Sequence, residues 1–278
     1  MDRPAIDNPI IEFRDVRKAF NGTTVLDGID LAVRPGDTTV VIGPSGCGKS
    51  VMLKTMIGLL RADSGSVNLC GVDITRMPER KLVNLRRRVG FLFQSGALFD
   101  SMTIEENICF PLHEHGIGDL HDRPKRAHEV LGHVGLSGLE HRFPEELSGG
   151  QKKRAALARA IVMEPQIILY DEPTTGLDPI RADLINELIV HLQATLKTTA
   201  VVVTHDMNSA RKIGDRIIML YGGRLVADTT PAGLENVKDD VVMRFVEGRA
   251  SDDELAGFGA TDWFAAAPPA DRKENARS

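Results

Sequence analysis

Apolar and polar residues follow regular spacings that predict strands and helices along most of the chain. Residues 10–20 and 25–33 mix apolar and β-branched residues with polar ones, as half-exposed antiparallel strands do. Short runs of apolar or β-branched residues at 38–42, 167–170 and 200–204 are typical of parallel strands buried on both faces. We therefore expect an antiparallel sheet near the N-terminus and a parallel sheet built from later segments.

Segments with helical spacing connect these runs. Residues 50–60 place apolar side chains on one helical face, and residues 150–163 and 180–196 are also predicted to be helical. Strands that alternate with helices predict an α/β fold with a mainly parallel sheet. Further strands are predicted at 67–69 and 88–93, and a hairpin at 216–220 and 224–226.

A polar segment at 116–149, which contains short helical stretches, interrupts this alternation. We interpret it as part of an inserted helical subdomain that spans about residues 96–159. After Gly248 the composition changes to Ala, Asp, Pro and Arg with little periodicity, which predicts a flexible tail. The predicted organisation is a domain at 10–248, with a catalytic core at 10–95 and 160–248, followed by a tail at 249–278.

Bulk properties exclude several classes of protein. The net charge of −5 gives no basic surface for wrapping nucleic acid. The first residues contain acids and no apolar region of the kind found in a signal peptide, and no stretch approaches the roughly 18 uncharged apolar residues of a membrane span. Any role at a membrane is therefore expected to come through a partner.

Residues 43–50 form a glycine-rich segment between a predicted strand and a predicted helix. Their sequence, Gly-Pro-Ser-Gly-Cys-Gly-Lys-Ser, matches the phosphate-binding pattern G-x-x-x-x-G-K-[ST]. Glycines let backbone N–H groups approach phosphate oxygens, and the helix that follows adds the positive end of its dipole. We therefore predict an ATP site in which Lys49 contacts the β- and γ-phosphates and Ser50 binds Mg²⁺. The other residues predicted to line it are Gly43, Ser45, Gly46, Cys47 and Gly48.

The buried run at 167–170 ends in two acids, Asp171 and Glu172. Downstream of a phosphate-binding loop, the first acid is expected to hold Mg²⁺ across from Ser50. The second is expected to polarise the attacking water as general base. These residues together predict ATP hydrolysis.

Residues 147–151, Leu-Ser-Gly-Gly-Gln, stand at a predicted helix start. A hydroxyl and exposed N–H groups there can accept an anion, although an ordinary helix cap has the same features. The pentapeptide resembles the signature motif of the ABC ATPases, and with the two motifs above it identifies the chain as a member of that family. The resemblance covers about residues 11–246. It implies a P-loop NTPase (RecA-like) core with an N-terminal antiparallel β subdomain and an inserted α-helical subdomain.

The resemblance assigns roles to further positions. Gln94 matches the Q-loop glutamine, which is expected to act in catalysis and metal binding, and His205 matches the switch histidine that contacts the γ-phosphate. Asp178 matches the D-loop, and Phe20 stands where the family places an aromatic ring against adenine. The signature residues expected to contact ATP are Ser148, Gly149, Gly150 and Gln151.

The resemblance also implies partners. In an ATP-dependent, head-to-tail homodimer, each ATP would lie between the phosphate-binding loop of one subunit and the signature residues of the other. An integral membrane permease is expected to dock near residues 94–112. The chain would then sit peripherally on the cytoplasmic face of the inner membrane, and no nucleic-acid partner is expected.

Two segments indicate which transporter is involved. Residues 94–99, followed by Phe-Pro-Leu at 110–112, resemble the ATPase subunits of MCE-domain (Mla-type) phospholipid transporters, and residues 242–248 resemble the C-terminal segment of that group. This resemblance implies lipid transport in a complex with an MCE-domain lipid-binding subunit. The alternatives are an importer ATPase for amino acids or another small solute, and a soluble ABC ATPase with no role in transport. The basic run Lys152, Lys153 and Arg154 is interpreted as a solvated helix face.

Overall fold

A computed structural model describes residues 8–249 of the 278-residue chain. The chain divides into two compact units, one ending at Leu234 and the other beginning at Glu235. Apart from its first residue, the tail predicted at 249–278 lies outside the described residues. Within residues 8–249, no helix combines the length and the apolar character needed to cross a membrane.

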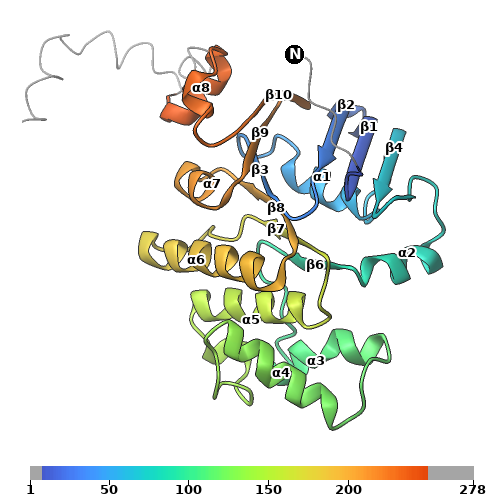
Figure 1. The fold of residues 1–278 in the computed structure, drawn as a ribbon, viewed down its shortest axis with the longest axis vertical. Coiled ribbons are helices and arrows are strands. Elements are labelled where there is room, and N and C mark those ends of the chain that lie inside the picture. The colour runs from blue at the N-terminus through green and yellow to red at the C-terminus, as the bar shows by residue number, and fades with distance from the viewer. Residues whose placement is uncertain (1–7, 250–278) are drawn as a thin grey trace, which may run out of the picture. The chain divides into compact units, whose positions relative to one another are not determined.

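The first unit contains two sheets, and the predicted strands are confirmed in both (Figure 1). One is antiparallel, in the order β2 (Thr23–Val33), β1 (Ile11–Phe20), β4 (Ser64–Leu69) and β5 (Val72–Asp73). The other has the order β10 (Arg224–Thr229), β9 (Arg216–Tyr221), β3 (Thr38–Ile42), β8 (Thr199–Thr204), β7 (Ile167–Asp171) and β6 (Val89–Leu92). Its pairs are parallel from β9 to β6, and β10 joins as the antiparallel partner of β9.

The register of the parallel sheet brings three strand ends to one edge. Ile42 pairs with Thr204, and Asp171 pairs with Val203, so β3, β8 and β7 end at nearly the same level. Every residue of these three strands is buried, which explains their apolar and β-branched composition. In open parallel sheets, functional loops leave from this carboxyl edge.

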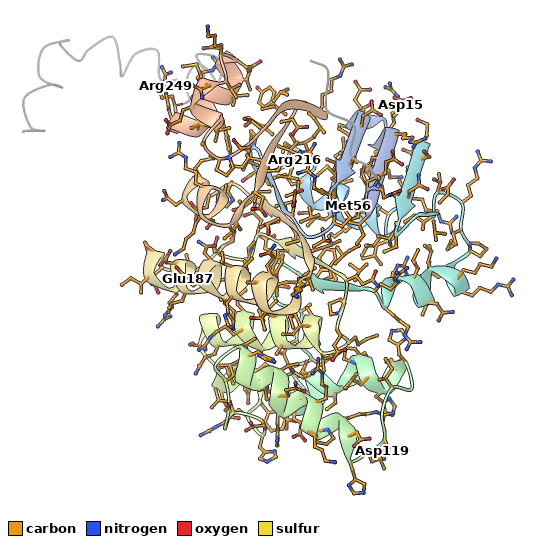
Figure 2. The ribbon with its side chains drawn as sticks, in the orientation of Figure 1. Asp15, Met56, Asp119, Glu187, Arg216 and Arg249 are labelled. Carbon is orange, nitrogen blue, oxygen red and sulfur yellow. The ribbon has the colours of Figure 1, made fainter. Side chains whose placement is uncertain are left out.

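Helix α1 (Lys49–Met56) lies between the two sheets (Figure 1). Met56, labelled in Figure 2, is fully buried and belongs to the core that joins α1 to Phe13 of β1 and Leu169 of β7. The predicted helix at 50–60 is thus confirmed, but it ends earlier, at Met56. The glycine-rich loop before it is therefore fixed at both ends by the packed core.

Helices α3 (Ile104–Glu114), α4 (Asp122–His133) and α5 (Gly149–Ile161) pack on one another (Figure 1), and α5 also packs against β6. The sequence pattern did not predict α3, because Pro111 lies inside it and proline usually ends a helix. A capping box nevertheless stabilises the start of the helix: the side chains of Thr103 and Glu106 each accept a hydrogen bond from the other residue's backbone N–H. The remaining helices are α2 (Glu79–Arg86), α6 (Pro179–Leu196) and α7 (Met207–Ile213), with short 3-10 turns at Pro144–Glu146 and Leu234–Asn236.

In the second unit, the described part holds one helix, α8 (Asp240–Glu247). The Asp239 side chain accepts hydrogen bonds from the backbone N–H groups of Val241 and Val242. Gly248 ends the helix with a φ of 66°, in the left-handed region that glycine tolerates. The change in composition after Gly248 therefore begins directly beyond a helix end.

Asn107 fastens the loop before α3, and replacing it should destabilise the protein. It is fully buried; its Oδ1 accepts from the Phe99 N–H, and its Nδ2 donates to the carbonyls of Phe99, Met102 and Thr103. Asn107→Ala should lower the free energy of unfolding by about 2–4 kcal/mol, because several buried backbone groups lose their partner. Urea unfolding followed by circular dichroism measures this loss. Glu114→Ala, at the exposed end of the same helix, is the control, and equal effects of the two changes would contradict the assignment.

Candidate active site

The glycine-rich loop follows β3 and turns into α1 where no larger residue fits. A Cβ on Gly43 would lie 2.3 Å from the Leu220 carbonyl oxygen, and one on Gly48 would lie 2.8 Å from Cγ1 of Val25. Both glycines also have positive φ, 152° and 106°, which L residues rarely adopt. Gly43 and Gly48, the two fixed glycines of the phosphate-binding pattern, are thus required by packing as well as by backbone conformation.

Lys49 begins α1 and turns its side chain back over the loop. Its Nζ donates hydrogen bonds to the carbonyl oxygens of Gly43 and Pro44, at 2.8 and 2.9 Å. The same ammonium group is 3.6 Å from Oε1 of Glu172, and the residue is only 5% exposed. A positive charge is therefore held at the centre of the loop.

Ser50 and Asp171 meet across the carboxyl edge of the sheet. The Ser50 hydroxyl donates to Oδ1 of Asp171 at 2.7 Å, and the Asp171 residue is 4% exposed. A hydroxyl and a carboxylate are the hard oxygen ligands that Mg²⁺ prefers. The pair therefore fits a magnesium site that adjoins the phosphate-binding loop.

Glu172 is the most constrained residue of the cluster. Its φ is 49°, which is uncommon for a residue with a side chain, and such conformations concentrate at functional sites. The backbone N–H donates to the Val203 carbonyl of β8, which fixes the residue at the sheet edge. Its Oε2 accepts from the Thr175 hydroxyl at 3.1 Å and lies 2.9 Å from Nδ1 of His205.

The structure thus brings together Lys49, Ser50, Asp171, Glu172 and His205 through direct contacts. All five lie at the carboxyl edge of the parallel sheet. Lys49 and Ser50 are the first residues of α1, Asp171 is the last residue of β7, and Glu172 and His205 directly follow β7 and β8. Together with Gln94, these are the residues for which the sequence predicted catalysis and metal binding. A carboxylate held 8% exposed beside a cation and a histidine can accept a proton from a bound water.

The other predicted residues lie elsewhere on the first unit. Phe20 ends β1, is 40% exposed, and has Nζ of Lys18 at 5.1 Å from its ring centre. Asp178 caps α6 by accepting from the Arg181 N–H. Gln94 is exposed in the turn after β6.

The signature residues form the N-terminus of α5. Ser148 caps this helix, and Gln151 accepts from the Ser148 N–H in return, so their polar contacts are with each other. Ser148 and Gly149 are exposed and Gly150 is partly so. The glycines place a bare helix end at the surface, where the positive end of the helix dipole can face an anion.

The interpretation of the basic run as a solvated helix face is wrong for Lys153 and Arg154. Lys153 is only 7% exposed, and Arg154 is half-buried with its guanidinium donating to the carbonyls of Val134 and Gly135. The sequence held one signal of this: Lys153 precedes Ala156 and Leu157 by three and four residues, so all three share a helix face. The apolar neighbours bury that face, and the lysine with it.

The chain is similar in sequence to known proteins. The family model described as ABC transporter matches residues 26–175. The "probable ribonucleotide transport ATP-binding protein mkl" of Mycobacterium bovis is 42% identical over 239 residues, which cover 86% of this chain and 67% of that protein. The "methionine import ATP-binding protein MetN" of Rhizobium johnstonii is 40% identical, over 81% of this chain and 62% of that protein.

Among solved structures, the dimeric ATP-binding cassette MJ0796, described as a post-hydrolysis state bound to ADP and Pi, has a similar fold. The TM-score is 0.74 with 34% sequence identity, over 80% of this chain and 98% of that one. The predicted fold class is confirmed by this likeness.

Proposed function

Because this chain belongs to the ABC transporter family, whose ATP-binding subunits bind ATP with Mg²⁺ and hydrolyse it, we propose that it powers phospholipid movement through a separate membrane permease. ATP hydrolysis follows from the family. The substrate, the residue roles and the complex are the proposal. Since the ATP supply is cytoplasmic, the proposal places the chain on the cytoplasmic face of the inner membrane.

In the proposed mechanism, the contacts around Glu172 define the hydrolytic step. Its carboxylate takes a proton from the attacking water, the water oxygen bonds to the γ-phosphorus, and the bond from that phosphorus to the bridging oxygen of ADP breaks. Lys49 balances charge on the β- and γ-phosphates. His205, whose Nδ1 lies 2.9 Å from Oε2 of Glu172, is assigned to contact the γ-phosphate. Ser50, Asp171 and Gln94 are the residues that would hold Mg²⁺, which would supply positive charge against the phosphate oxygens.

A head-to-tail homodimer completes the proposed site. Ser148 and Gly149 are exposed and Gly150 is partly exposed at a helix N-terminus, so they are available to an ATP held by a second copy. The second subunit would exclude water from the γ-phosphate and add hydrogen-bond donors there. Phe20 is assigned to adenine and Asp178 to the contact between the two sites.

An apolar groove supports the proposed docking of a permease near residues 94–112. It has a volume of about 500 Å³ and is lined in part by Phe91, Phe93, Phe99, Phe110 and Arg159. The rings of Phe99 and Phe110 lie 4.7 Å apart, and Phe99 is 41% exposed. Exposed aromatic residues in a groove are typical anchors for a partner helix.

Removing the exposed ring should release the permease without stopping hydrolysis. Phe99→Ala should reduce the permease retained after detergent extraction by about ten-fold, since one aromatic anchor contributes about 1–2 kcal/mol or more to such an interface. The isolated chain should keep its ATPase rate. Leu120→Ala removes another exposed apolar side chain of the helical group, 80% exposed, and should change neither property. Undiminished permease binding by Phe99→Ala would exclude this groove as the docking surface.

The observation that carries the lipid assignment is the pairing of residues 94–99 with Phe-Pro-Leu at 110–112. In sequence these segments resemble the ATPases of MCE-domain phospholipid transporters, and in the fold four of their residues, Ala97, Phe99, Phe110 and Pro111, line part of the same groove. The test is purification of the tagged chain from its own membranes in mild detergent, with mass spectrometry of bound proteins and lipids. A permease with an MCE-domain protein and phospholipid would support the proposal.

A small-solute importer is the second candidate, because relatives that are 40–42% identical to this chain over the aligned residues are named for ribonucleotide transport and methionine import. In the same purification it would appear as a permease with a soluble solute-binding protein. Absence of any membrane protein would leave a soluble ABC ATPase. The three outcomes exclude one another.

A further inference from the structure

Helix α5 contains a buried lysine, Lys153, whose ammonium group contacts the backbone next to the proposed catalytic carboxylate. Lys153, five residues after the Ser148 cap, is 7% exposed, and its Nζ donates to the backbone carbonyl of Gln94. The same nitrogen lies 3.4 Å from the carbonyl of Glu172. One side chain from the signature helix therefore touches the backbone of both the Gln94 turn and the proposed general base.

The surroundings of Lys153 favour a retained charge. Burial lowers the pKa of this ammonium group, while the nearby carboxylates of Asp171 and Glu172 act in the opposite direction. A buried charge is costly unless it is paired and hydrogen-bonded. The two carbonyls and the two acids supply that compensation, so the position of the lysine depends on the arrangement of the site.

A second cation from α5 holds the same turn. The guanidinium of Arg159 donates to the carbonyls of Gly96 and Ala97, at 2.9 and 2.7 Å, and lies 5.9 Å from the ring centre of Phe99. The segment from Gln94 to Phe99 is thus bonded to one helix at two places. A displacement of that segment must either move α5 or break these bonds.

The backbone of Glu172 adopts an uncommon conformation that neighbouring groups must hold in place. Its φ of 49° is held by its neighbours, and its carboxylate must stay near the γ-phosphate for the proposed reaction. A cation at its carbonyl oxygen fixes the peptide that follows it, and the same cation links that peptide to Gln94.

We propose that Lys153 is a positioning residue for hydrolysis, whose ammonium group couples the signature helix and the Gln94 turn to the backbone of Glu172. The proposal rests on the assignment of Glu172 as general base. Lys153 touches neither substrate nor metal in it. Its loss should therefore lower the rate of the chemical step and leave nucleotide binding intact.

Lys153→Met tests this, because methionine fills similar space without the charge. With the purified full chain, we expect kcat for MgATP to fall about ten-fold or more, while the dissociation constant for a fluorescent ATP analogue changes less than three-fold. Hydrogen exchange at the amides of residues 94–96 should rise. Lys152→Met makes the same change one position earlier on α5 and should alter none of these quantities.

Three results would overturn the proposal: an unchanged kcat, an equal loss in Lys152→Met, or a fall in ATP affinity as large as the fall in kcat. If Lys153→Met does not purify as a folded protein, Lys153→Gln carries the same test. It keeps one hydrogen-bond donor, and its kcat should lie below that of the unmodified chain. Lack of turnover in the unmodified chain would instead count against the proposed function, and it would be seen before any variant is compared.

Discussion

Glu172→Gln should reduce the steady-state ATPase rate by about 10²–10⁴-fold while ATP stays bound. Glutamine is nearly isosteric, and its oxygen can still accept from Thr175, so the site should keep its shape. It cannot take the proton of the attacking water, and the reaction stops before the γ-phosphate is released. ATP that bridges two subunits would then persist, and the variant should accumulate as a homodimer.

The measurement is size-exclusion chromatography with light scattering in MgATP, together with phosphate release. Glu187→Gln is the matched control: this glutamate lies on α6 (Figure 2), is exposed, and pairs with Lys212. The control should hydrolyse ATP normally and dimerise no more than the unmodified chain. A monomeric Glu172→Gln in saturating ATP would contradict the head-to-tail dimer, and an undiminished rate would contradict the role of Glu172.

Lys49→Ala should lower ATP affinity about 100-fold and bring turnover close to background. A charged hydrogen bond to phosphate contributes up to about 3 kcal/mol, which corresponds to that factor. The fold should survive, because alanine is a good helix former and α1 is anchored by Met52, Leu53 and Met56. The loss of bonds to the carbonyls of Gly43 and Pro44 should cost only about 1–3 kcal/mol of stability.

Titration calorimetry with ATP and circular dichroism separate the two effects. Lys54→Ala, in the last turn of the same helix, is the control and should bind ATP as the unmodified chain does. Substantial ATPase activity in Lys49→Ala would refute the assigned phosphate site. Loss of helical signal in that variant would show that the change acts on the fold rather than on binding.

The strand at 38–42 was predictable because burial on both faces selects apolar and β-branched residues, and the helix starts near residues 150 and 180 carry capping side chains. The helix that starts near residue 50 has no side-chain cap, but its apolar face predicted it. Helix α3 was not, since Pro111 argues against a helix. Buried Asn107 and the packing of α3 on α4 and α5 outweigh that local preference.

For the site, the sequence alone determined the residue types. The glycine-rich loop, the acids that end β7, His205 and the signature segment could each be named from spacing and resemblance, because phosphate and metal chemistry restrict which residues serve. The tertiary structure decided which of these residues contact one another. Because of the parallel register, β3, β7 and β8 end at nearly the same level, and Glu172 therefore contacts both Lys49 and His205.

Only the fold could show which groups the buried ammonium group of Lys153 contacts, namely the backbone carbonyls of Gln94 and Glu172. Its hydrogen-bond acceptors are backbone carbonyl groups, which every residue has, so no pattern of side chains in the sequence could predict them. What a residue is follows from the sequence, but which backbone groups surround it follows from the packing of distant segments.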